Sequence, residues 1–175
     1  MKGMTLMLIV MAASFLIAGA WGLPAIKDSV HFILDPTAGS LLNLNPVFGM
    51  LVIVFVMVLI TTIIQKYGTN QAELRKLKEE QKILQQEMKK YKNNPDKLME
   101  FQKKQLEFIP KTFDLTTKSL VYTFIPLILF FRWFNDYFTT NLVGYKYFGF
   151  LSWFWVYLIF SVIFSSILRK VLKVV

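Results

Sequence analysis

The chain contains no cysteine and only one histidine, His31. Without cysteine it can form no disulfide, no thiolate metal site and no cysteine nucleophile. We interpret His31 as an ordinary interfacial histidine, because a lone histidine supplies no site geometry. The motifs H-E-x-x-H, G-x-x-x-x-G-K and G-x-S-x-G are also missing, as is a pair of acids inside a hydrophobic run. We therefore expect a protein that is not an enzyme and that has neither a metal site nor a cofactor.

Charge is missing from long stretches of a sequence that is 55% hydrophobic and 16% aromatic. Hydrophobic runs cover 4–23, 47–64, 120–138 and 147–168, and neither 47–64 nor 147–168 contains a charged residue. A helix of about 20 apolar residues is long enough to cross the hydrocarbon core of a bilayer. The predicted fold class is therefore an all-α integral membrane protein.

The first run permits several interpretations. It follows Lys2 and ends in Ala18-Gly19-Ala20, an A-x-A pattern that also occurs at signal-peptide cleavage sites. Segment 1–23 is thus an extra span, a cleaved signal or a peripheral helix. In the linker 24–46, apolar residues recur at helical spacing between polar ones, which predicts an amphipathic helix at the outer interface.

The basic residues are segregated along the chain. Of the 20 Lys and Arg residues, 13 lie between Lys66 and Lys118, and three more belong to the tail 169–175. Lys and Arg are enriched in cytoplasmic loops. We therefore predict that 65–118 and the tail face the cytosol, that the linker 24–46 and the loop 139–146 face outward, and that the protein is a multi-pass protein of the cytoplasmic (plasma) membrane.

The polar block 65–118 predicts an antiparallel helical hairpin with a coiled-coil seam. Asn70 and Asn94 are suited to cap its two helices, and Pro110 is expected to end the second one. We expect two heptad rows to pack against each other within the hairpin, with a dimer seam as the alternative. The rows are Leu74, Leu77, Gln81, Leu84, Met88 and Tyr91, and then, after the break Asn93-Asn94-Pro95-Asp96, Met99, Gln102, Leu106 and Ile109.

Polar residues also occur in the spans, at a depth common to three of them. Polar groups are costly in hydrocarbon and usually face a bundle interior or a watery cavity, which predicts a hydrophilic vestibule open to the cytosol. The alternative is that the Ser and Thr hydroxyls satisfy backbone carbonyls or allow close helix packing. Arg132 is expected to snorkel outward or to pair with Asp136. The predicted lining residues are Thr61, Thr62, Gln65, Lys66, Thr123, Ser161 and Ser165.

The order of these elements resembles the YidC/Oxa/Alb insertase superfamily: a span, a cytosolic helical hairpin, and two spans joined by a short outer loop. The chain looks like one of the small archaeal YidC-like members over about 47–168. Its last third is also similar to the insertase subunit of the ER membrane complex. The short motifs that carry this similarity are Ile125-Pro126-Leu127-Ile128-Leu129, Trp133-Phe134-Asn135 and Leu151-Ser152-Trp153-Phe154.

The resemblance implies a membrane chaperone or insertase with a three-span core, formed by 47–64, 119–138 and 147–168, around a groove open to the cytosol. This groove would receive hydrophilic segments of nascent membrane proteins, and the basic hairpin and tail would meet the ribosome, including its rRNA. Relatives commonly hold a basic residue inside the groove, whereas here Lys66 is the nearest candidate and Val162 occupies the position that is basic in the ER relative. The implied partner contacts are Lys89, Lys90, Lys92, Arg169, Lys170 and Lys173.

The net charge of +9 adds anionic membrane lipids to the expected partners. A monomer is favoured. Two other functions stay open: a membrane-anchored docking or scaffold subunit that uses the coiled-coil hairpin, and a small ion channel formed by oligomers. The small number of ionisable groups at membrane depth argues against the channel.

Overall fold

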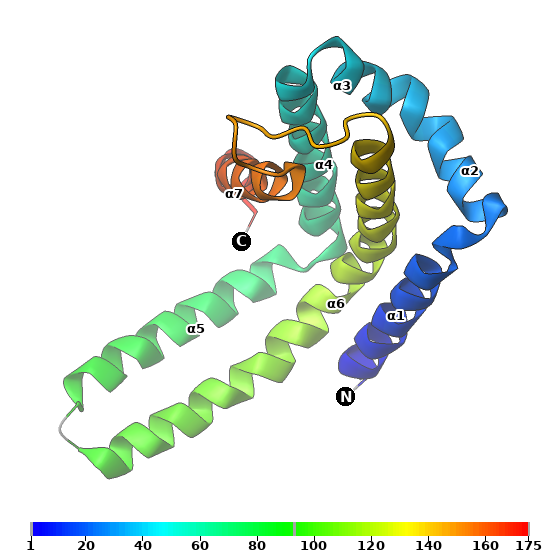
Figure 1. Ribbon diagram of the computed structural model, residues 1–175. Coiled ribbons are helices and arrows are strands. Elements are labelled where there is room, and N and C mark those ends of the chain that lie inside the picture. The colour runs from blue at the N-terminus through cyan, green and yellow to red at the C-terminus, as the bar shows by residue number, and fades with distance from the viewer. Residues whose placement is uncertain (1, 93, 175) are drawn as a thin grey trace.

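The computed structural model describes residues 2–92 and 94–174, apart from the side chains at 2–4, 6, 7 and 118. Asn93 of the predicted break and the side chains of Lys2 and Lys118 therefore lie outside the described part. Within that part the chain is helical, with one isolated antiparallel bridge between Tyr147 and Leu151 (Figure 1). The helical elements are α1 (Lys2–Gly19), η1 (Ala20–Gly22), α2 (Pro24–Leu34), η2 (Asp35–Gly39), α3 (Ser40–Leu44), α4 (Pro46–Gly68), α5 (Gln71–Lys90), α6 (Pro95–Thr140) and α7 (Trp153–Val171).

Two helices, α4 and α7, are long and apolar enough to cross a membrane. Two bent helix pairs meet the same test: Leu8–Gly22 with Pro24–Leu44, bent by 90°, and Pro95–Thr117 with Ser119–Thr140, bent by 66°. The described residues thus contain two to four candidate spans, as expected for an all-α membrane protein.

Helix α4 begins where the sequence supplies a capping side chain. The Asn45 side chain accepts hydrogen bonds from the backbone N–H groups of Val47 and Phe48, each at 3.0 Å, and Pro46 occupies the first helical position. A Cβ atom on Gly49 would lie 2.5 Å from the carbonyl oxygen of Leu41. The glycine therefore lets α3 lie directly against the first turn of α4.

Helix α6 is much longer than the sequence predicted. It continues through Pro110 and Pro126, so the expectation that Pro110 ends the second hairpin helix is wrong. An interior proline removes one hydrogen bond and costs a helix about 3 kcal/mol. The packing of Phe101 and Phe108 on the preceding turns against α5 offsets this cost. The sharp bend comes later, between the segments that end at Thr117 and begin at Ser119.

Helix α5 and the first half of α6 lie side by side and run antiparallel (Figure 1). Asn70 and Asn94 cap them as predicted, accepting from the backbone N–H groups of Glu73 and Lys97 at 3.3 and 3.2 Å. We call this pair the hairpin. The bundle consists of α4, the second half of α6 and α7. We call its end near the hairpin the hairpin end, and its opposite end, near the 141–152 loop, the loop end.

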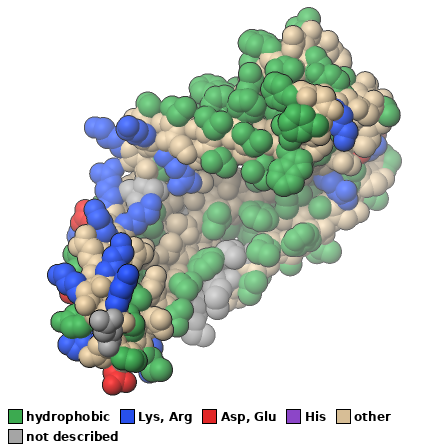
Figure 2. Space-filling view, turned by 60° about the vertical axis from the view of Figure 1, so that its left-hand side comes forward, with side chains coloured by type: hydrophobic (Ala, Val, Ile, Leu, Met, Phe, Trp, Pro, Cys, Tyr) green, Lys and Arg blue, Asp and Glu red, His purple; other side chains and the backbone are tan. Residues whose placement is uncertain are grey.

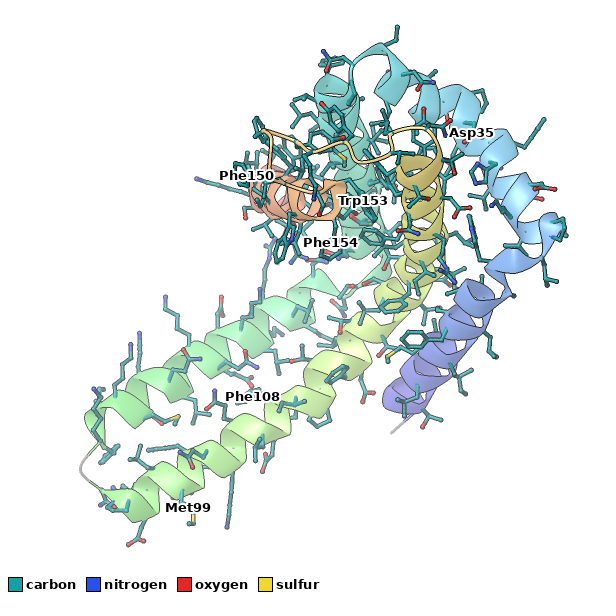
Figure 3. All side chains as sticks on the ribbon, in the orientation of Figure 1. Asp35, Met99, Phe108, Phe150, Trp153 and Phe154 are labelled. Atoms are coloured by element: carbon teal, nitrogen blue, oxygen red, sulfur yellow. The ribbon has the colours of Figure 1, made fainter. Side chains whose placement is uncertain are left out.

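The register of α6 in the hairpin differs from the prediction. Leu74, Leu77 and Leu84 of α5 are buried as expected, but Met99, Leu106 and Ile109 of α6 are 61%, 63% and 50% exposed. Figure 3 shows Met99 on the side of α6 that faces away from α5. Instead α6 turns a neighbouring row toward α5, with Leu98 and Phe108 half-buried and Phe101 buried. Aromatic side chains remove more apolar surface from water, so this row takes the interior position.

The core of the bundle is aromatic and lies toward the loop end. Trp133, Phe134 and Tyr147 are fully buried. The ring of Trp153 at the start of α7 stacks on Phe134 and Phe138, with interplanar angles of 7° and 17° (Figure 3). Helix α7 begins at this tryptophan rather than at Tyr147, because the chain first makes a tight turn.

Candidate functional site

The polar residues near the hairpin end converge on one arginine. Arg169 of α7 donates from Nη2 to Gln65 Oε1 at 2.7 Å and from Nε to Ser165 Oγ at 3.2 Å. Gln65 and Ser165 were predicted to line a groove, and Arg169 was predicted as a partner contact. The structure brings all three together and uses the guanidinium to join α4 to α7.

Two more hydrogen bonds bring the base of the hairpin to the same place. Gln71 Nε2 of α5 donates to the backbone carbonyl of Gln65 at 2.9 Å. Arg75 Nη2 donates to the carbonyl oxygen of Lys173 in the tail at 2.7 Å. The end of α4, the start of α5 and the end of α7 therefore form one polar junction.

The predicted hydroxyl residues bond within their own helices. Thr61 and Thr62 both donate to the carbonyl of Val58, at 3.0 and 2.6 Å, and Thr123 donates to that of Ser119 at 3.0 Å. Ser161 does the same with Leu158 at 2.8 Å. The alternative that these hydroxyls satisfy backbone carbonyls is thus confirmed for the four residues.

Accessibility then separates these hydroxyls into two groups. Thr62 and Thr123 are only 2% and 8% exposed, whereas Thr61 and Ser161 are half-buried. A hydroxyl that donates its proton keeps lone pairs that can accept another hydrogen bond. Thr61 and Ser161 can therefore still accept a hydrogen bond from another molecule, and Thr62 and Thr123 serve packing.

A buried group of hydroxyls surrounds the bend of α6. Thr117 and Ser119 are 2% and 3% exposed. A Cβ on Gly68, at the end of α4, would lie 3.2 Å from Ser119 Cβ. Small residues thus allow α4 to end against the bend, which directs the hairpin away from the bundle.

Cations lie both beside this junction and at the far end of the hairpin. Lys66 is half-buried in the last turn of α4, with Nζ 5.7 Å from the ring centroid of Tyr67. The predicted partner residues Lys170 and Lys173 are exposed at the end of α7, and Lys89, Lys90 and Lys92 are exposed near the hairpin tip. Figure 2 shows Lys and Arg side chains gathered on this side of the molecule, with few acids between them. The hairpin end therefore attracts anionic groups.

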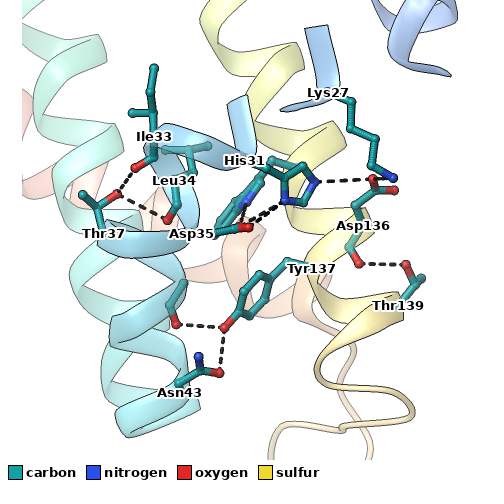
Figure 4. A network of polar contacts seen from close by, with 12 residues as sticks. Lys27, His31, Ile33, Leu34, Asp35, Thr37, Asn43, Asp136, Tyr137 and Thr139 are labelled. Carbon is teal, nitrogen blue, oxygen red and sulfur yellow. Dashed lines mark hydrogen bonds and ion pairs between the residues drawn. The ribbon is translucent and has the colours of Figure 1, made fainter. Parts of the chain in front are cut away.

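A second polar network lies near the loop end (Figure 4). His31 Nδ1 is 3.0 Å from Asp35 Oδ2, and His31 Nε2 is 3.6 Å from Asp136 Oδ2. Trp133 Nε1 donates to Asp35 Oδ1 at 2.7 Å, and Tyr137 donates to the carbonyl of Gly39 at 2.9 Å. Among the described residues His31 is hydrogen-bonded through Nδ1 alone, because Nε2 lies beyond hydrogen-bonding distance of Asp136. The tryptophan and tyrosine contacts attach η2 to α6.

The predicted pairing of Arg132 with Asp136 is wrong. Arg132 Nε donates to the carbonyl of Ala18, at the end of α1, at 2.9 Å. Asp136 instead accepts from Lys27 Nζ at 2.8 Å and from Trp21 Nε1 at 2.9 Å. These partners lie more than 100 residues away in sequence, and no local pattern indicates them.

The chain was compared with known proteins. Residues 31–148, which are more than half of the chain, match the family described as integral membrane protein EMC3/TMCO1-like. No curated protein and no solved structure matches. The family is insertase-related, is not known to be enzymatic, and belongs to the YidC/Oxa1/Alb3 superfamily. The matched part runs from His31 in α2 through α4, the hairpin and α6 to the turn before α7. It includes Gln65, Gln71 and Arg75 of the junction, whereas Ser165, Arg169 and Lys173 lie beyond it. The chain therefore belongs to the EMC3/TMCO1-like family of integral membrane proteins.

Proposed function

We propose that this protein is a membrane protein insertase that receives hydrophilic segments of client proteins at the junction around Arg169. Its core would be three spans, formed by α4, the second half of α6 and α7, with the hairpin as a cytosolic coiled coil. Membership of the EMC3/TMCO1-like family supports this function. The observation that carries the site is the bonding of Gln65 and Ser165 to one half-buried guanidinium.

The physical argument concerns the cost of moving polar groups into a bilayer. A peptide group without a hydrogen-bond partner in hydrocarbon costs several kcal/mol. A guanidinium has five N–H donors, so Arg169 can hold Gln65 and Ser165 and still donate to a client carbonyl. Thr61 and Ser161 can accept from client N–H groups. Together they would lower the cost of a polar client segment at this depth.

The same arginine would supply the basic groove residue that relatives commonly have. The sequence has no charge in 47–64, and Lys66 lies only at the end of α4. Arg169 follows the apolar part of α7, but its side chain donates a hydrogen bond to Gln65 at the end of α4. We therefore propose that Arg169, rather than Lys66, takes this role, and that the chain is a small archaeal YidC-like protein.

Charge distribution supports an orientation with the hairpin and tail in the cytosol of a plasma membrane. The segment 66–118 and the tail hold 16 of the 20 basic residues, whereas the loop 139–146 holds one. In this orientation Lys89, Lys90 and Lys92 and the tail lysines Lys170 and Lys173 would be available to the ribosome and its rRNA. Such contacts are electrostatic and weaken as salt rises.

Site-specific photocrosslinking tests this function. Probes at Thr61, Gln65, Ser161 and Ser165 would be placed in membranes that carry stalled ribosome–nascent chains of a small membrane protein. Matched probes belong at Ile60 and Ile163, which are exposed apolar positions on the same two helices. We expect adducts at the polar positions and few at the apolar ones. Equal labelling of both sets would contradict a polar client site.

A further inference from the structure

Much of the charge on α5 is sorted onto two flanks, although Glu79, four residues after Arg75, lies outside this pattern. Acidic residues seven apart follow one flank, and a basic row with alternating three- and four-residue steps follows the other. The buried row of Leu74, Leu77 and Leu84 lies between them. The acidic flank comprises Glu73, Glu80 and Glu87, and the basic row comprises Arg75, Lys78, Lys82, Lys89 and Lys92, with Gln85 at its middle position.

The acidic flank meets opposite charge within the hairpin. Glu80 and Glu87 line a recess of about 350 Å³ together with Lys104 and Lys111 of α6. Lys104 Nζ is 2.7 Å from Glu100, whose hydrogen bond and charge raise the pKa of Lys104, with a smaller contribution from Glu87. With Glu107, which also lines the recess, this side of the hairpin brings charges of both signs together.

The basic flank borders a different kind of recess. On this side α5 and α6 form a recess of about 450 Å³ whose lining is entirely uncharged. A further recess of about 270 Å³ shares Gln81 and Ile109 with it and extends it toward Phe113. We call the two together the glutamine groove. The first recess is lined by Gln81, Gln85, Gln102, Gln105, Leu106 and Ile109.

The α6 wall of this groove carries the exposed apolar side chains of Leu106 and Ile109. The steps of three and four residues continue to Phe113, which also lines the contact of α6 with Val10 and Met11 of α1. This face of α6 is thus covered by α1 around Phe113 and is left open along the hairpin. A helix with two apolar faces is typical of a bundle of three helices, because each face packs on a different neighbour.

We infer that the glutamine groove binds an amphipathic helix of a partner protein, with an apolar face toward Leu106 and Ile109 and acidic residues toward Lys82 and Lys89. Apolar side chains at steps of three and four residues on α6 form a row that can pack against the apolar row of a second helix. The basic row of α5 complements an acidic flank. The glutamine amides accept and donate hydrogen bonds without adding charge.

Other anionic partners fit this surface less well. A bilayer surface is flat and would leave the recessed amides without partners. A nucleic acid would satisfy the lysines but would leave Leu106 and Ile109 exposed to water. The inference does not depend on insertase activity, so it can fail or hold independently of the proposed function.

The test uses the full-length protein in nanodiscs of zwitterionic lipid and a fluorescent synthetic helix of about 20 residues. The probe has a leucine row at steps of three and four residues and glutamates on its flanks, and a matched probe has lysines in place of the glutamates. Fluorescence anisotropy should show binding of the glutamate probe, weakened by salt, and no binding of the lysine probe. Equal binding of both probes, or of neither, would overturn the inference.

Matched variants locate the site. Leu106→Gln and, separately, Lys82→Glu should each weaken binding by about tenfold or more. Ile83→Gln alters an apolar side chain that is 57% exposed on α5 away from the groove, and Lys76→Glu alters an exposed lysine outside the basic row. Both controls should bind normally. Leu106→Gln alters the apolar contact and Lys82→Glu alters the charge, so each variant tests one of the two interactions separately. Circular dichroism verifies that each variant is folded.

Anionic vesicles and poly(U) RNA provide the remaining comparison. If vesicles that contain phosphatidylglycerol, or the RNA, bind through Leu106 and Lys82 while the glutamate probe does not bind, the surface is a lipid or RNA site and the inference is wrong. If the glutamate probe binds and neither competitor displaces it at physiological salt, the protein partner is supported.

Discussion

Arg169 Nη2 lies 2.7 Å from Gln65 Oε1, although the two residues are separated by the hairpin, all of α6 and most of α7. This bond closes the hairpin end of the bundle. It joins α4, the most apolar span, to α7, whose remaining ring contacts with α6 lie near the loop end at Trp153, Phe154 and Tyr157. The two ends of α7 are therefore held by different chemistry, aromatic contacts at one end and hydrogen bonds from a guanidinium at the other.

Replacing Arg169 should damage both stability and function. Arg169→Gln removes two charge-assisted hydrogen bonds. Such a bond contributes up to about 3 kcal/mol to the free energy of unfolding, and less where the side chain is half-buried. Arg169→Lys should recover only part of the loss, because an ammonium lacks the planar fork that reaches both acceptors. Thermal unfolding in detergent and insertion of a small client would measure the two effects. Lys76→Gln, at an exposed position outside the junction and the proposed ribosome contacts, is the control, and an equal loss there would show that net charge alone matters.

Gly49 should tolerate no side chain. Gly49→Ala places a methyl group 2.5 Å from the Leu41 carbonyl oxygen, a distance that requires α3 to move. Overpacking of this kind typically costs about 1–3 kcal/mol. Gly22→Ala is the matched control, since nothing lies within 4 Å of its Cβ position. Denaturation midpoints that fall equally for both variants would contradict the close approach of α3 and α4.

Local signals in the sequence were sufficient for much of the fold. Asn45, Asn70 and Asn94 cap helices because a side-chain amide followed by a helix-forming segment needs no distant partner. The uncharged run 47–64 lies within α4 for a similarly local reason, its length and composition. The family then follows from the order of such elements.

The sequence alone did not decide which of two apolar rows on α6 faces α5. On α6 the row of Met99, Leu106 and Ile109 and the row of Phe101 and Phe108 lie only one or two residues apart, which is about 100–160° around the helix. Both are apolar, and only the packing against α5 decides between them. A comparison of side-chain size would have favoured the aromatic row, since it buries more surface.

Contacts between residues far apart in the sequence were also not predicted. Asp136 lies four residues after Arg132, so an i,i+4 pair was the natural local expectation. The folded chain instead provides Lys27 and Trp21, which α2 and η1 bring alongside α6. The same applies to Arg169, whose acceptor on α4 no spacing in the sequence reveals.

The network around Asp136 should hold α2 against α6. Asp136→Asn keeps an acceptor for Trp21 but removes the charge that pairs with Lys27, so the cost should be modest, about 1 kcal/mol. Hydrogen exchange along α2 should increase, because Lys27 would lose its anionic partner on α6. Asp28→Asn removes an exposed acid on the same helix and should leave exchange unchanged. Unaltered exchange in both variants would show that the apolar contacts of α2 suffice.

The register of the hairpin can be tested by paired truncations on α6. Phe101→Ala empties a position that is 9% exposed and should cost about 3–5 kcal/mol, since it leaves a cavity against α5. Met99→Ala, two residues earlier and 61% exposed, should change stability by no more than about 0.5 kcal/mol. Equilibrium unfolding of the full-length protein would measure both. If Met99→Ala were the more damaging, the heptad row expected from the sequence would face α5 after all. The groove wall would then be occupied from within the hairpin, and the surface available to an acidic partner helix would disappear with it.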